Sequence, residues 1–103
     1  MSAHCPDEVK YAVAERVRSR IERMAAAGEP LSGRAIAGLV TVNGIRVVTD
    51  DGTWGLVRAS SNKPELVVVI ESPVSEARLR EMFLAVDGIL RQNPEVGAYN
   101  QTL

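Results

Sequence analysis

The chain has 103 residues, of which 46% are hydrophobic, 24% are charged and only 4% are aromatic. This length suits one domain with one modest core and leaves no room for an active-site cleft between two lobes. Twelve lysines and arginines against thirteen aspartates and glutamates give a net charge of -1. That balance argues against general binding to nucleic acid or to an anionic membrane.

The sequence also argues against a membrane span, an export signal and a structural metal site. Apolar runs such as Leu66 to Ile70 are far shorter than the ~20 residues that a span requires. The N-terminal segment Met1 to Cys5 has no charged region followed by an apolar stretch, so no secretory signal is predicted. A single cysteine forms no internal disulfide, and one cysteine with one histidine is too few for a zinc site. We therefore expect a cytoplasmic protein.

The first predicted element is a helix over residues 6–27. Pro6 suits a first helical position, and the two carboxylates after it favour the positive end of the helix dipole. Apolar residues then recur at spacings of three and four, at Val9, Val13, Val17, Ile21 and Met24. Gly28 is predicted to end the helix in the left-handed conformation, and Pro30 prevents its resumption.

Four strands are predicted next, at residues 39–42, 45–48, 54–57 and 66–70. Asn43-Gly44 between the first two is the strongest short hairpin signal, since both turn positions favour positive φ. The last strand is an unbroken apolar run, which predicts a strand covered on both faces or nearly so.

A second helix is predicted after Ser75, a candidate N-cap. Its apolar stripe comprises Leu79, Met82, Phe83, Val86 and Leu90. Asn93-Pro94 ends it, and residues 95–103 show no periodicity. The order α-β-β-β-β-α predicts an α+β fold with a four-stranded antiparallel sheet and both helices on one face. With no domain boundary visible, residues 1–103 are predicted to form a single domain.

Three groups of polar residues are weak candidates for a functional site. His4 and Cys5 are adjacent but have no third partner nearby, and we predict a frayed or lightly packed end. Asp50-Asp51 precedes a turn glycine, which favours turn chemistry over metal binding. A phosphate-binding stripe and a solvated helix surface are the alternatives for Arg16, Arg18, Arg20 and Arg23. The intervening Glu15 and Glu22 favour the solvated surface. No catalytic residue and no metal ligand is predicted in this chain.

The strongest candidate site is the loop between the last two predicted strands. Arg58 offers a planar fork of donors that suits two phosphate oxygens. The loop adds short polar side chains and a second positive charge, at Ser60, Ser61, Asn62 and Lys63. Successive backbone N–H groups in such a turn can line an anion-binding nest. A phosphate-binding loop and an ordinary polar hairpin loop both account for this composition.

The same region resembles a known family. The stretch Trp54 to Ser60, the polar residues up to Pro64 and the apolar strand Leu66 to Ile70 resemble the C-terminal domain of bacterial phosphomannomutase/phosphoglucomutase. That enzyme belongs to the α-D-phosphohexomutase superfamily. Asn43-Gly44-Ile45-Arg46 is similar to the family's usual Asp-Gly-Val/Ile-Arg turn, and Cys5 to Lys10 looks like the segment that enters this domain. The resemblance covers nearly the whole chain.

The resemblance implies a fold and a function. The family's last domain has a four-stranded antiparallel sheet with flanking helices, similar to the TATA-binding protein. Family enzymes are isomerases of carbohydrate metabolism, in which four domains surround one cleft and interconvert 1- and 6-phosphosugars. A phosphoserine in the first domain transfers the phosphoryl group, the second domain binds Mg²⁺, and the third recognises the sugar. The fourth holds the phosphate that is not reacting and closes the cleft by rotating.

Three expectations follow from this resemblance. This chain's partners are a phosphosugar and the other domains of the parent enzyme, Mg²⁺ is bound by another domain, and the isolated chain is inactive. By position, Arg58 and Ser60 match the family's phosphate-binding arginine and serine. Ser61 and Asn62 stand where family members usually carry Asn or Gly and then Thr, and Lys63 where Thr or Glu is common. The alternative is a free-standing module that binds a phosphorylated ligand or a protein.

Overall fold

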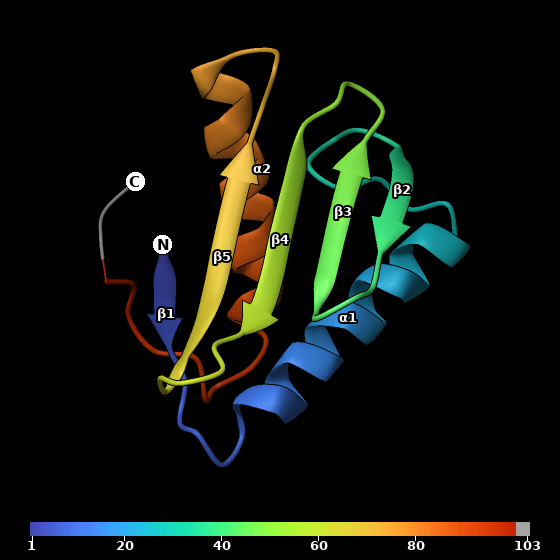
Figure 1. Ribbon diagram of the computed structural model, residues 1–103. Coiled ribbons are helices and arrows are strands. Elements are labelled where there is room, and N and C mark those ends of the chain that lie inside the picture. The colour runs from blue at the N-terminus through green and yellow to red at the C-terminus, as the bar shows by residue number, and fades with distance from the viewer. Residues whose placement is uncertain (101–103) are drawn as a thin grey trace.

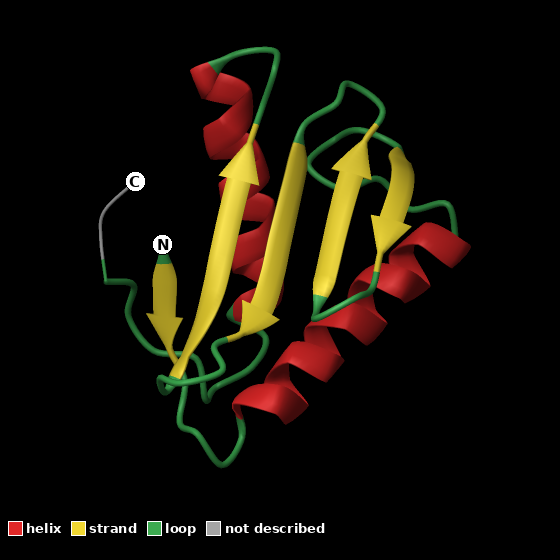
Figure 2. Ribbon diagram, in the orientation of Figure 1, coloured by secondary structure: helices red, strands yellow, loops and turns green. Residues whose placement is uncertain are grey.

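Two helices cover one face of a five-stranded antiparallel sheet in the computed structural model, which describes residues 1–100 (Figures 1 and 2). In chain order the elements are β1 (Ser2–His4), α1 (Lys10–Ala26), β2 (Ile36–Val40), β3 (Ile45–Thr49), β4 (Trp54–Ala59), β5 (Glu65–Glu71) and α2 (Glu76–Leu90). The α+β prediction and the placement of both helices on one face are confirmed. Within residues 1–100, no helix is both long enough and apolar enough to cross a bilayer.

The sheet has the order β1-β5-β4-β3-β2, and every neighbouring pair is antiparallel. The core lies between the sheet and the helices. Its largest fully buried members include Val13, Ile21, Ile45, Val57, Leu66, Met82 and Leu90. In β5, Leu66 and Val68 are buried, whereas Val67 and Val69 are only half-buried. The predicted cover on both faces of this strand is therefore wrong, because both helices pack on the same face.

The prediction of four strands is also wrong, because the N-terminal segment adds a fifth. Ala3 of β1 pairs with Leu66 of β5 on one side and with Tyr99 on the other. Ala3 and Cys5 are fully buried, so this end is neither frayed nor lightly packed. A strand of three residues shows too little alternation of apolar and polar residues to be recognised in a sequence. Residues 95–100, which include its partner Tyr99, show no periodicity either. Residues 101–103, the end of the segment expected to lack periodicity, lie outside the described residues.

The helix ends follow local chemistry. Ser75 caps α2 as predicted, since its hydroxyl accepts a hydrogen bond from the Arg78 backbone N–H at 3.0 Å. Gly28 takes the predicted left-handed conformation, with φ of +71°. The predicted start of the first helix at residue 6 is wrong, because the Pro6 carbonyl accepts from the N–H groups of both Val9 and Lys10 and closes a turn first.

The predicted hairpin at Asn43-Gly44 forms, but with a wider loop. Asn43 and Gly44 have φ values of +56° and +98°. Val40 pairs with Arg46, so residues 41–44 all lie in the loop and β2 begins earlier than predicted. A Cβ on Gly44 would lie 2.2 Å from the Val57 carbonyl oxygen and 2.8 Å from the Arg58 Cβ. This glycine therefore lets the turn pack directly against β4.

The turn between β3 and β4 contains a largely buried ion pair that was not predicted from the sequence. Asp51 accepts hydrogen bonds from the Thr53 N–H at 3.0 Å and the Thr49 hydroxyl at 2.8 Å, as the predicted turn chemistry requires. Its other carboxylate oxygen lies 2.6 Å from Nε of Arg78, on α2. The Arg78 guanidinium also donates to the Ser32 hydroxyl at 2.6 Å. The pair thus ties α2 to this turn.

Candidate functional site

The predicted loop, now residues 60–64 between β4 and β5, borders a polar hollow. This hollow, the Arg58 cleft, has a volume of about 570 Å³. It lies at the end of the sheet where β4 ends, β3 begins and α1 starts (Figure 1). Its lining residues are Tyr11, Ala14, Glu15, Thr41, Asn43, Gly44, Arg58, Ala59 and Ser61. Three segments that are distant in the sequence therefore form one site.

Arg58 is the one basic side chain among the lining residues of this cleft. It is the second-last residue of β4 and is half-buried. Among residues 1–100, no acceptor forms a hydrogen bond or ion pair with its guanidinium. By contrast, Arg16, Arg18, Arg34, Arg78 and Arg91 each have a carboxylate partner. A half-buried arginine without a protein acceptor in a concave site suits a carboxylate or a phosphate.

The backbone of the β4–β5 loop is rich in free donors. The N–H groups of Ser61, Asn62 and Lys63 donate to no protein acceptor within the described part of the chain. The carbonyls that follow them are occupied. The Lys63 oxygen accepts from the Glu65 N–H at 2.8 Å, and the Pro64 oxygen accepts from the Cys5 N–H at 2.8 Å. The loop therefore has three successive free N–H groups, while the carbonyls of Lys63 and Pro64 accept hydrogen bonds from protein donors. This arrangement favours binding of an anion.

The structure brings together some of the predicted site residues and not others. Arg58 and Ser61 both line the cleft. Ser60 is buried, and its hydroxyl donates to Oδ1 of Asn62 at 3.2 Å inside the loop. Asn62 and Lys63 are exposed in the same loop but do not line the cleft. The site thus consists of an arginine, a serine and backbone donors, with Asn62 and Lys63 beside it.

Sequence reasoning did not assign α1 residues to this site. Tyr11, Ala14 and Glu15 share one face of the helix, at spacings of three and four, and form one wall of the cleft. Glu15 would oppose an anion, but the hydrogen bond from Arg18 holds the pKa of Glu15 below its usual value and keeps its negative charge paired. The helical spacing was visible in the sequence, but nothing there indicated that this face meets the β4–β5 loop.

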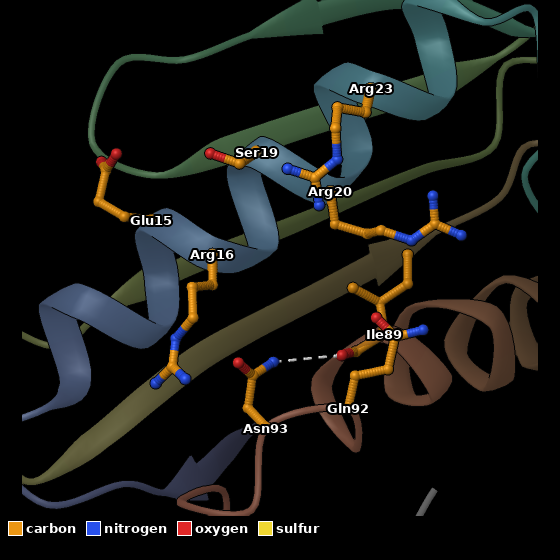
Figure 3. Close-up of a pocket in the computed structure, with 8 residues that line it drawn as sticks. All are labelled: Glu15, Arg16, Ser19, Arg20, Arg23, Ile89, Gln92 and Asn93. Carbon is orange, nitrogen blue, oxygen red and sulfur yellow. Dashed lines mark hydrogen bonds between the residues drawn. The ribbon is translucent and has the colours of Figure 1, made fainter.

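A second hollow, of about 430 Å³, lies between α1 and the end of α2 (Figure 3). Arg16, Arg20 and Arg23 of the predicted stripe line it, whereas Arg18 pairs with Glu15 and Glu22 elsewhere on the helix. Arg16 lies 2.6 Å from Glu95, and Arg20 lies 3.5 Å from Glu29. Because two of its three guanidinium groups already have carboxylate partners, this hollow suits an anion less well than the Arg58 cleft does.

The family resemblance implies a Mg²⁺ ion, which is expected in another domain. Within residues 1–100, no three His, Cys, Asp or Glu side chains are grouped closely enough to hold a metal ion. Asp51 is already engaged by Arg78 and two threonines. No step through a metal is therefore assigned to this chain.

Comparison with known proteins shows the family of the chain. Residues 8–89 match the family described as "Phosphoglucomutase/phosphomannomutase, C-terminal domain". The chain is 38% identical to a phosphopentomutase of Thermococcus kodakarensis over 79 residues, which are 77% of this chain and 16% of that protein. It is 31% identical to a probable phosphoglucosamine mutase of Methanothermobacter thermautotrophicus over 72 residues, which are 70% of this chain and 14% of that protein. The aligned part is thus about one-sixth of the length of these curated relatives. The chain belongs to the C-terminal domain family of the α-D-phosphohexomutase superfamily.

Proposed function

We propose that this chain is the phosphate-gripping C-terminal domain of a longer phosphohexomutase, with residues 1–103 as one domain. It holds the phosphate that is not reacting while the enzyme interconverts 1- and 6-phosphosugars. The observation that carries the proposal is the unpaired Arg58 in the cleft, next to a loop whose residues 61–63 have free backbone N–H groups. Arg58, Ser60, Ser61, Asn62 and Lys63 are the proposed phosphate-binding residues, with the Ser60 hydroxyl turning from Asn62 to the ligand.

The proposed role is physically reasonable for a domain without catalytic groups. Contacts to a remote phosphate supply binding energy that orients the sugar at the reacting bond. Closure of such a domain excludes the water that would otherwise take the phosphoryl group. Backbone and small hydroxyl donors make few demands on the shape of the attached sugar. This tolerance accords with relatives whose names specify different sugars, a pentose in one and glucosamine in the other.

The rest of the chemistry is assigned to other parts of the parent enzyme. The phosphoserine, the Mg²⁺ site and the loop that selects the sugar are proposed to lie in other domains, and these domains are the partners of this one. Selection between mannose, glucose, glucosamine and pentose phosphates would then occur outside this chain.

Titration with a phosphosugar tests the proposed site directly. Addition of mannose 6-phosphate or glucose 1-phosphate to ¹⁵N-labelled chain is expected to shift the amide signals of residues 58–63. Binding should be weak, with a dissociation constant of roughly 1 mM or more, since one wall of a cleft makes few contacts. Unphosphorylated glucose is the control and should shift none of these signals. Shifts confined to the α1–α2 hollow, or no shifts at high ligand concentration, would contradict the assignment.

The isolated chain is expected to have no mutase activity. The phosphoryl donor and the metal are proposed to lie outside it, so glucose 1-phosphate should remain unconverted in the presence of Mg²⁺ and a bisphosphorylated sugar. A coupled assay for glucose 6-phosphate measures this, with an intact family enzyme as the positive control. Turnover that copurifies with the 103-residue chain would overturn the proposed division of labour.

A further inference from the structure

We infer that Lys10 is a positioning residue, whose buried ammonium group holds the β4–β5 loop in the conformation that binds phosphate. This inference rests on the proposed function and adds to it a residue that lies outside the loop. Lys10 is the first residue of α1 and is only 4% exposed, although it is charged. A lysine is seldom buried to this extent unless it is paired and hydrogen-bonded.

The contacts of Lys10 explain why it is buried. Its Nζ atom donates to the Lys63 carbonyl oxygen at 2.9 Å and lies 2.9 Å from a carboxylate oxygen of Asp7. Asp7 supplies the compensating charge and is itself largely exposed. The ammonium group therefore links the first turn of α1 to the tip of a loop 53 residues away in the chain.

The position of this link matters for anion binding. A carbonyl oxygen carries a partial negative charge, and one that faced a bound phosphate would repel it. The Lys10 ammonium and the Cys5 N–H draw the Lys63 and Pro64 carbonyls toward the N-terminal segment. The peptide unit between Lys63 and Pro64 has no N–H, because proline lacks one, so its carbonyl oxygen is its only polar group. Lys10 thus keeps this acceptor occupied, while the N–H groups of residues 61–63 remain free.

A second geometric feature connects Lys10 to the cleft. The Nζ atom lies 5.3 Å from the centre of the Tyr11 ring, and Tyr11 lines the cleft with Arg58. The ammonium group therefore lies close to one wall of the cleft, although Lys10 is not among the lining residues.

Replacement of Lys10 by methionine tests the inference, since it keeps most of the side-chain volume and removes the donor. Inorganic phosphate and mannose 6-phosphate are titrated into the labelled variant and the unaltered chain. We expect binding to weaken about tenfold, equivalent to ~1.4 kcal/mol, and amide exchange at Cys5 and Glu65 to accelerate by a similar factor without ligand. In the unaltered chain, these two amides should exchange slowly.

Two matched variants separate positioning from general stability. Asp7→Asn removes the partner charge but leaves the Lys10 donor, and it should keep phosphate affinity within about twofold. Val86→Ala removes buried methyl groups on α2 and should lower the melting temperature without changing phosphate affinity. Equal affinity in Lys10→Met and the unaltered chain would overturn the inference. So would an equal loss of affinity in Val86→Ala, or rapid exchange at Cys5 and Glu65 in the unaltered chain.

The exchange measurement also distinguishes this inference from the proposed function. If the unaltered chain binds no phosphate although Cys5 and Glu65 are protected and Lys10→Met exposes them, the link exists but the assigned ligand is wrong. If phosphate shifts residues 58–63 equally in both proteins, the site is correct and the role of Lys10 is wrong.

Discussion

Replacement of Arg58 by alanine is expected to lower kcat/KM of the intact parent enzyme by about 100-fold, with a rise in KM. Each hydrogen bond from a guanidinium to a phosphate contributes about 1.5 kcal/mol, and loss of a two-fold contact therefore removes about 3 kcal/mol. The Arg58 side chain has no protein partner within residues 1–100, so its loss should leave the fold intact. Steady-state kinetics with glucose 1-phosphate measure the effect, and melting curves verify stability.

Arg46 provides a matched control for this experiment. It is an exposed arginine on the neighbouring strand β3, its guanidinium lies 4.2 Å from the centre of the Trp54 ring, and it does not line the cleft. Arg46→Ala changes the net charge equally and should alter kcat/KM by less than about threefold. Arg58→Lys should restore only part of the activity, since an ammonium group lacks the planar fork. An unchanged kcat/KM in Arg58→Ala would remove Arg58 from the mechanism.

The second large effect concerns stability. Arg78→Met is expected to lower the melting temperature of the chain by about 10 °C or more. The substitution leaves the largely buried Asp51 carboxylate without its cationic partner. The side chains of Arg78 and Asp51 are only 9% and 13% exposed, and the pair joins α2 to the β3–β4 turn. Thermal unfolding followed by circular dichroism measures the shift.

A neighbouring ion pair supplies the control. Arg34 and Asp50 lie 2.7 Å apart with side chains 49% and 46% exposed, so Arg34→Met should change the melting temperature by no more than about 3 °C. Similar losses in the two variants would show that burial of the Arg78 pair is unimportant. The distances in the two pairs are nearly the same, so the expected difference in melting temperature comes from their different exposure to solvent.

The same pair gives the chain a defined acid sensitivity. Burial raises the pKa of Asp51, but hydrogen bonds from Thr53, Thr49 and Arg78 outweigh it and hold that pKa well below its usual range. The carboxylate therefore contributes stability that is fully present above its unfolded pKa of ~3.9 and is lost as the pH falls toward the folded value. Asp51→Asn should flatten the decline in melting temperature below about pH 4.

Much of the fold was predictable because its central elements carry strong local signals. The stripe from Val9 to Met24, the Ser75 cap and the Asn43-Gly44 turn each correspond to an observed feature. The failures lie where tertiary contacts decide the structure. β1 has no pattern of its own and exists because β5 offers an open edge. One face of β5 is not covered by a helix, because both helices pack on the other face. A run of valines in the sequence does not indicate on which face the helices pack.

The site was predicted only along one stretch of chain. Arg58 and Ser61 were identified because charge and short polar side chains gather in one loop. The wall formed by Tyr11 and Glu15, and the buried Lys10, were not identified, since their roles depend on contacts with residues about fifty positions away. Composition locates the candidate loop, but the contacts that shape this loop are visible only in the folded chain.

The pairing of β1 has a consequence for synthesis on the ribosome. Ala3 is made before its partner Leu66, and its other partner Tyr99 is made later still. At about 5–20 residues per second, synthesis from Leu66 to Tyr99 takes roughly 2–7 s. During that time β1 is paired on one side only, and its detachment would leave the outer edge of β5, with its run of valines, open to pairing with other chains. Slow translation of residues 67–99 would lengthen this period, so expression yield should depend on the codons used there.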